Sequence, residues 1–174
     1  MDAPHVKYEA VGQVARLTID RPELRNAVSE QAMREIGEGL SRAEGDAAVR
    51  VVVLTGAGEK IFCAGGDLST MSGEGGFLGG HDSRRAYGLL LKRIQDCRKP
   101  TIARVNGHAL AGGLGLMLAC DLAVAADTAG FGLPEIDRGL FPMQVIALLQ
   151  RHLARKQAYW LVMSGTRVTA AEAL

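Results

Sequence analysis

Apolar residues along this chain follow two patterns, one typical of strands and one typical of helices. Residues 14–20 show the partial alternation of a strand, and residues 6–10 are expected to pair with them. Residues 33–43 carry apolar side chains every three or four positions, which predicts an amphipathic helix with Ser29 as its N-cap. Residues 50–55 contain a continuous apolar run, as in a strand buried on both faces of a parallel sheet.

Strand and helix patterns keep alternating through the second half of the chain. A helix is predicted to begin at Asp82, and a strand follows at residues 101–106. Residues 114–119 predict a short apolar helix, residues 122–126 a further strand, and Pro142 the first turn of another helix. Repeated strand–helix–strand units imply right-handed crossovers, so the sequence predicts an α/β fold.

Three segments depart from this alternation. Residues 68–71 are expected to form a short helix, and the glycine-rich residues 73–80 are expected to be poorly ordered. Near the end, Thr169 and Glu172 have the spacing of a capping box, which predicts the start of a helix. The chain has only two further residues, so we expect a C-terminally truncated form of a longer protein.

Composition narrows the classes of function. The 174 residues are 48% hydrophobic and 22% charged, which suits one globular domain over 1–174. A net charge of +1 argues against a nucleic-acid partner. Three scattered cysteines without a C-x-x-C pair argue against disulfides and structural zinc. With no apolar leader and no run long enough to span a membrane, the expected location is cytoplasmic.

Two glycine-rich turns are the first candidates for chemistry. Residues 63–68 and 106–115 each follow an apolar strand, and Gly112 and Gly113 lead into a helix. Glycine lets a ligand approach the backbone closely, and the first N–H groups of a helix lack internal partners. The turns therefore predict two backbone donors around one oxygen, the basis of an oxyanion hole. Neither turn has the spacing of a dinucleotide-binding or phosphate-binding loop, which ranks a generic nucleotide-binding domain last.

Glu135 is the candidate acid or base. It lies in an apolar, glycine-bearing segment, residues 130–137, where partial burial would raise its carboxyl pKa. The alternative is a solvated loop glutamate, and Asp137 is interpreted as structural. The four histidines have no metal-ligand spacing, so no metal site is predicted. Cys63 is expected to be a small buried side chain and Trp160 to lie in the core.

Five motifs, in order and in register, resemble the crotonase, or enoyl-coenzyme A hydratase/isomerase, superfamily over essentially the whole chain. They are residues 21–27 (RPELRNA), 62–68 (FCAGGDL), 106–113 (NGHALAGG) with Cys120-Asp121 behind it, Pro134-Glu135, and 139–142 (GLFP). The resemblance implies a crotonase-like spiral of ββα units that lacks its C-terminal helical segment. It also implies an acyl-CoA thioester as substrate.

The same resemblance implies roles for individual residues. The amides of Gly66 and Gly112 would form the oxyanion hole, with Glu135 as the acid/base group. Coenzyme A would enter as part of the substrate, with no separate cofactor. A homotrimer or a dimer of trimers is implied if the C-terminal segment is present. The implied lining of the coenzyme A pocket is Arg25, Ala27, Ala64, Gly66 and Leu68.

One departure from the family pattern bears on the reaction. The family's hydratases carry a glutamate three residues after the second oxyanion donor, and this chain has Gly115 there. A single acid/base glutamate favours double-bond isomerisation, in which one group removes and returns a proton. Hydration of a 2-enoyl thioester and a non-catalytic role in acyl-CoA binding stay open as alternatives.

Overall fold

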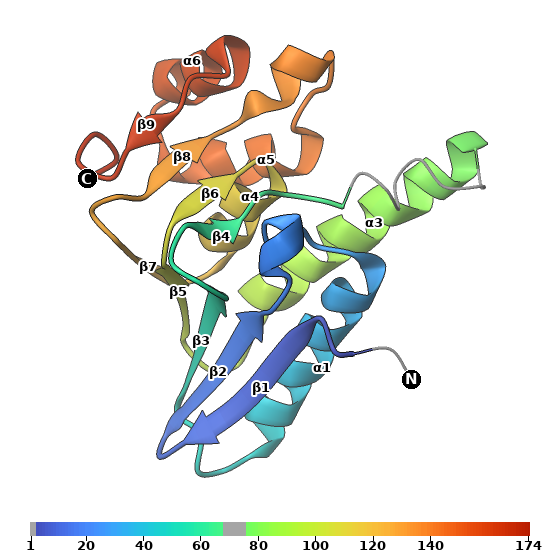
Figure 1. The fold of residues 1–174 in the computed structure, drawn as a ribbon, viewed down its shortest axis with the longest axis vertical. Helices are drawn as coiled ribbons and strands as arrows, with labels where there is room; N and C mark the ends of the chain where they lie inside the picture. The colour runs from blue at the N-terminus through green and yellow to red at the C-terminus, as the bar shows by residue number, and fades with distance from the viewer. Residues whose placement is uncertain (1–2, 68–75) are drawn as a thin grey trace.

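The computed structural model describes residues 3–67 and 76–174, without the side chains of 76–81 and 83, and contains two sheets (Figure 1). The larger sheet has the order β1-β2-β3-β5-β7, in which β1 and β2 are antiparallel and the other pairs parallel. The smaller sheet has the order β4-β6-β8-β9. The strand bounds are β1 Val6–Val11, β2 Val14–Ile19, β3 Val51–Gly56, β4 Ile61–Cys63, β5 Thr101–Val105, β6 His108–Leu110, β7 Leu122–Ala125, β8 Gly130–Gly132 and β9 Val168–Thr169.

The chain passes repeatedly from the larger sheet to the smaller sheet and then into a helix. The repeats are β3-β4-α3, β5-β6-α4 and β7-β8-α5, which confirms the predicted spiral of ββα units. The helices are α1 Glu30–Gly45, α3 Gly76–Gln95, α4 Gly112–Ala119, α5 Met143–His152 and α6 Arg155–Ser164, with 3-10 turns η1 Pro22–Leu24 and η2 Pro134–Arg138. Helix α1 begins as predicted at Ser29, whose Oγ accepts from the Ala32 N–H.

Side-chain amides hold the corners where strands leave the larger sheet. Asn106 Oδ1 accepts from the Gly56 N–H at 3.0 Å, and Asn26 Nδ2 donates to the Ile61 carbonyl at 2.8 Å. These bonds satisfy backbone groups that no ladder can pair, because the chain changes sheets there. These bonds hold the two sheets together at the corners. The turns that follow β4 and β6 begin close to these corners.

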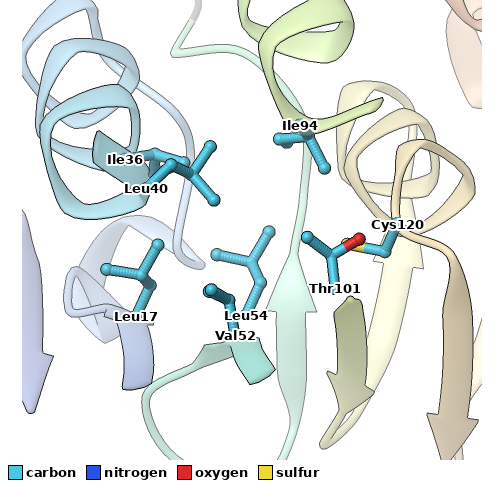
Figure 2. Close-up of a pocket in the computed structure, with 8 residues that line it drawn as sticks. All are labelled: Leu17, Ile36, Leu40, Val52, Leu54, Ile94, Thr101 and Cys120. Carbon is cyan, nitrogen blue, oxygen red and sulfur yellow. The ribbon is translucent and has the colours of Figure 1, made fainter. Parts of the chain in front are cut away.

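The core lies between the larger sheet and its helices, where α1 packs against α3. Leu17, Leu40 and Ile94 line one small void there (Figure 2), and all three have little or no exposure. The void among these side chains is about 10 Å³. That volume is no larger than a single water, so the core offers no ligand site.

The structure corrects three expectations. Helix α3 begins at Gly76, so Asp82 lies inside it, and residues 76–80 of the glycine-rich segment are helical. Trp160 is 54% exposed on α6 instead of lying in the core. Thr169 and Glu172 form the reciprocal bonds of the predicted capping box. The short helix expected at residues 68–71 lies outside the described residues.

No helix in the described part of the chain combines the length and the apolar character that a bilayer crossing requires.

Candidate active site

The first glycine turn leaves β4 and is fastened on both sides of Gly66. The Val28 N–H donates to the Gly65 carbonyl at 2.8 Å, and the Asp67 N–H donates to the Val28 carbonyl at 3.0 Å. Gly65 needs its glycine, because its φ is 105°. Between these bonds the Gly66 N–H has no acceptor among the described residues, and Gly66 is exposed. The turn therefore presents one free donor at the surface.

A buried ion pair secures the end of this turn. Arg21 binds Asp67 at 2.9 Å, and the two side chains are 10% and 9% exposed. Arg21 also donates to the Ala27 carbonyl at 2.7 Å. The segment preceding α1 reaches the turn through the Ala64 N–H, which donates to the Arg25 carbonyl at 3.1 Å. The pair was not predicted, since its partners are far apart in the sequence.

The second glycine turn begins helix α4. Ala111, its N-cap, has φ 51° and ψ −127°, a conformation that side chains rarely adopt and that costs on the order of 1–3 kcal/mol. The Ala111 N–H donates to the Gly132 carbonyl at 2.9 Å. Gly112 is the first helical residue, so its N–H has no intrahelical partner, and it donates to no other described residue. The strained cap therefore directs a second free donor out of the helix.

The two turns are in direct contact. A β-carbon on Gly112 would lie 3.4 Å from the Gly65 Cα, and one on Gly65 would lie 3.1 Å from the Gly112 nitrogen. A β-carbon on Gly113 would lie 2.7 Å from the Cys63 carbonyl carbon. The glycines are therefore needed for backbone packing between β4 and α4. This contact brings the segments that carry the Gly66 and Gly112 amides together.

Glu135 lies in η2, which directly follows β8 and Leu133. Its Oε2 is buried and has no hydrogen-bond partner in the described part of the chain. Burial raises the carboxyl pKa above its ordinary value, and a hydrogen bond from the residue's own N–H partly opposes that shift. A carboxylate with a raised pKa and a free oxygen is suited to accepting and returning a proton near neutral pH.

Tyr87 of α3 connects these groups, and the sequence analysis did not select it. Its hydroxyl donates to the Gly112 carbonyl. Burial raises the Tyr87 pKa well above its usual value, and the charges of Cys63 and Glu135 raise it further. Tyr87 therefore contacts the second turn directly, and its hydroxyl lies within electrostatic range of Glu135. A tyrosine within an apolar helical stripe carries no sequence signal that separates it from a core residue.

Two neighbouring residues are excluded from the chemistry. Cys63 is fully buried, and burial raises the pKa of its thiol to about 12, so it stays protonated and unreactive. Asp137 is exposed and faces Gly165, where a β-carbon would lie 3.4 Å from its Oδ1. Among the described residues, no group of three or more histidine, cysteine, aspartate or glutamate side chains could hold a metal ion.

A pocket of about 570 Å³ lies beside the first turn. Of the five residues predicted to bind coenzyme A, Arg25 and Ala64 line it, Ala27 and Gly66 do not, and Leu68 lies outside the described residues. The residues lining it include three basic side chains against one acidic side chain, and are Pro22, Arg25, Glu59, Lys60, Ile61, Ala64, Gly107, His108, Leu110, Thr128 and Arg167. A pocket of this charge suits a ligand that carries phosphates.

His108 adds an unpaired polar group to this pocket. Its Nδ1 is buried and has no partner among the described residues. Burial lowers the His108 pKa, and the charge of Arg167 lowers it further, which favours the neutral ring at neutral pH. The unpaired Nδ1 faces Gly130, where a β-carbon would lie 3.1 Å from it, and is covered by the protein. Arg167 comes from the segment before β9, far from His108 in the sequence.

Comparison with known proteins shows which proteins this chain resembles. Residues 9–174 match the family model described as enoyl-CoA hydratase/isomerase. The chain is 36% identical to a short-chain-enoyl-CoA hydratase from Clostridium acetobutylicum, over 100% of this chain and 67% of the relative. It is also 36% identical to a carnitinyl-CoA dehydratase from Proteus mirabilis, over 94% of this chain and 62% of the relative.

Solved structures give the same result. The human enoyl coenzyme A hydratase domain-containing protein 3 superposes with a TM-score of 0.93 at 26% identity, over 98% of this chain and 67% of that protein. Pseudomonas aeruginosa AtuE superposes with a TM-score of 0.92 at 37% identity, over 98% and 66%. The chain thus spans about two thirds of the length of the relatives that it matches.

Proposed function

This chain belongs to the enoyl-CoA hydratase/isomerase family, and on that premise we propose that it is an enzyme acting on an acyl-CoA thioester. The observations that carry the proposal are the Gly66 and Gly112 amides, which have no acceptor among the described residues and lie in two touching turns, and the buried Glu135 Oε2, which has no partner there either. Coenzyme A enters with the substrate, so the proposed reaction needs no resident cofactor.

In the proposed mechanism, the thioester oxygen accepts hydrogen bonds from the Gly66 and Gly112 amides. In the direction from a 3-enoyl to a 2-enoyl thioester, the Glu135 carboxylate removes a proton from the carbon between the carbonyl and the double bond. The electron pair of that C–H bond moves into the conjugated system, and negative charge develops on the thioester oxygen. Each backbone donor contributes about 3 kcal/mol to stabilising that charge, because it is oriented before the reaction begins.

Double-bond isomerisation is the reaction that a single carboxylate serves best. After removing the proton, Glu135 returns it to another carbon of the same conjugated system, so the double bond moves and no atom is gained or lost. Gly115 contributes no second carboxylate, and Asp137 is exposed and directed at Gly165. We therefore propose conversion between 3-enoyl and 2-enoyl thioesters as the main activity.

Hydration is the second candidate, and the names of the Clostridium and Proteus relatives, a hydratase and a dehydratase, favour it. Addition of water needs one group to activate the water and one to deliver a proton. Loss of one such group typically lowers the rate by about 10²- to 10⁴-fold. A non-catalytic acyl-CoA-binding role is the third candidate, and Gly115 is the feature that favours it.

The basic pocket is proposed to hold the phosphate-bearing part of coenzyme A. Arg25 directly follows η1, Lys60 directly precedes β4, and Arg167 comes from the C-terminal part of the chain. Ala64 lies both in this pocket and two residues before the Gly66 amide. A thioester bound in the pocket could therefore extend along the turn to the free donors.

The surface around α5 and α6 is proposed to be covered in the assembled protein, as a homotrimer or a dimer of trimers. This region carries four large apolar side chains that are more than half exposed in the described chain, and exposed apolar patches often mark interfaces. They are Phe141, Met143, Trp160 and Met163, which are 57%, 65%, 54% and 71% exposed. Sedimentation of the whole protein tests this proposal, and a monomer at all concentrations contradicts it.

The experiment that tests the proposed function supplies matched 2-enoyl and 3-enoyl thioesters and separates the isomerised and hydrated products. Isomerisation is expected to exceed hydration, and Glu135→Gln is expected to lower turnover by at least about 10³-fold without weakening thioester binding by more than about threefold. Hydration as the main reaction would favour the second candidate. Binding without any product would favour the third, and full activity of Glu135→Gln would remove that residue from the mechanism.

A further inference from the structure

Tyr87 contacts the residue that supplies the second proposed amide donor. It extends from α3 to the first turn of α4, where its hydroxyl donates to the Gly112 carbonyl. A β-carbon on Gly112 would lie 3.3 Å from both the Cζ and the hydroxyl oxygen of Tyr87. The phenol thus packs directly against the backbone of Gly112.

Gly115 is matched to the same side chain. A β-carbon at position 115 would collide with the Tyr87 hydroxyl and lie 3.0 Å from the Val145 Cγ2. A glycine inside a helix destabilises the helix by about 1 kcal/mol relative to alanine. Gly115 therefore has a physical reason to be in α4 only if a neighbour needs the space that a side chain would fill. Tyr87 fills that space, and position 115 can carry no side chain while the hydroxyl stays in place.

The surroundings keep this hydroxyl protonated. Burial raises the Tyr87 pKa, and the charges of Cys63 and Glu135 act in the same direction. The proton is donated to the Gly112 carbonyl, so it is held within the protein. Tyr87 is therefore a hydrogen-bond donor to the Gly112 carbonyl at neutral pH.

We propose that Tyr87 is a positioning residue for the thioester-oxygen site, a role that rests on the proposed function. Its bond to the Gly112 carbonyl holds the first turn of α4, and with it the orientation of the Gly112 N–H that emerges from the strained Ala111 cap. Gly115 leaves the room that this bond requires. In this proposal Tyr87 and Gly115 together align the Gly112 amide, and neither residue contacts the substrate.

The first test is Tyr87→Phe, which keeps the ring and removes the hydroxyl. We expect kcat to fall about tenfold with KM within about twofold, because the misaligned amide stabilises the developing charge less well than before. Tyr8→Phe is the matched control. Tyr8 is also a partly buried tyrosine, and its hydroxyl has no partner in the described residues, so its removal is expected to leave kcat unchanged.

A second measurement separates a positioning role from a merely structural one. It is the stretching frequency of a ¹³C-labelled thioester carbonyl bound to the protein, which a merely structural role would not change. Glu135→Gln serves as the background, because the ligand must not react. The bound carbonyl is expected to shift to lower frequency, and Tyr87→Phe in this background is expected to reduce the shift at saturating ligand. An undiminished shift in Tyr87→Phe overturns the inference.

Gly115→Ala provides a second route to the same state, since the new methyl group must displace the Tyr87 hydroxyl. It is expected to lower kcat about tenfold, and to have little effect when Tyr87→Phe is already present. Additive effects of the two substitutions overturn the inference even if one variant folds poorly. No carbonyl shift in the Glu135→Gln parent, together with no turnover by the unsubstituted protein, would instead refute the proposed function itself.

Discussion

At the residue scale, burial of Glu135 leads to a pH dependence with a defined sign. Its carboxyl pKa is raised by burial above 4.5, and only the ionised form can accept a proton. We expect kcat/KM to fall as the pH is lowered through the raised pKa, with the inflection above pH 4.5. A pH–rate profile measured on the unsubstituted protein tests this, and an inflection at or below 4.5 would contradict it.

The same shift has a consequence for folding. Between its unfolded and folded pKa values, Glu135 binds more protons in the native state than in the unfolded state, so stability decreases as the pH rises through that window. Glu135→Gln is therefore expected to raise the thermal midpoint at neutral pH and to have a smaller effect below pH 4. Equal effects at both pH values would show that the carboxylate is not destabilised by burial.

Residue identity alone predicted part of this site. The two glycine turns and Glu135 were selected from local signals in the sequence, whereas the choice of Gly66 and Gly112 as the two donors came from the resemblance to the family. Tyr87 was not selected, because its role arises from a contact between two helices. It lies 25 positions before Gly112 in the sequence. Trp160 was misassigned, since hydrophobicity does not tell which apolar face a neighbouring element covers.

At the element scale, the contact between β4 and the first turn of α4 determines where the two donors lie. Gly113→Ala is expected to destabilise the protein by about 2–3 kcal/mol, because its β-carbon would overlap the Cys63 backbone, which cannot move without shifting β4. Denaturant unfolding measures this effect.

Gly37→Ala in α1 is the matched control. Nothing lies within 4 Å of a β-carbon at that position, so the substitution is expected to stabilise the protein by about 0.5–1 kcal/mol through helix propensity alone. Destabilisation by Gly37→Ala, or tolerance of Gly113→Ala, would contradict the packing described for the two turns.

Element boundaries were predicted best where a cap or a periodic stripe marks them. Helix α1 begins at Ser29 as expected, because a serine side chain satisfies the first free amides. Helix α3 begins at Gly76, well before Asp82, although glycine has a low helix propensity. Strand β7 was predicted from its apolar run, yet Leu122 and Val124 are exposed because β7 is at the edge of its sheet.

At the scale of the whole molecule, the basic pocket combines residues from the first and last parts of the chain. Lys60→Ala is expected to weaken binding of a coenzyme A thioester by about five- to tenfold, and to leave binding of a pantetheine thioester that lacks the nucleotide unchanged. Titration calorimetry measures both affinities. Lys92→Ala, which removes an exposed lysine paired with Asp96, is the control.

Equal losses for both ligands would mean that Lys60 does not recognise phosphate.

The pocket itself was only partly predictable. Arg25 and Ala64 belong to local motifs, whereas Arg167 joins them through the pairing of β8 with β9, which no local pattern in the sequence predicts.

The most direct measurement for the central claim is the crystal structure of Glu135→Gln with an acyl-CoA thioester bound. The amide nitrogens of Gly66 and Gly112 are both expected within about 2.7–3.1 Å of the thioester oxygen, with the side chain of residue 135 facing the carbons next to the carbonyl. A thioester oxygen that is bound elsewhere, or that contacts only one of the two amides, would contradict the account.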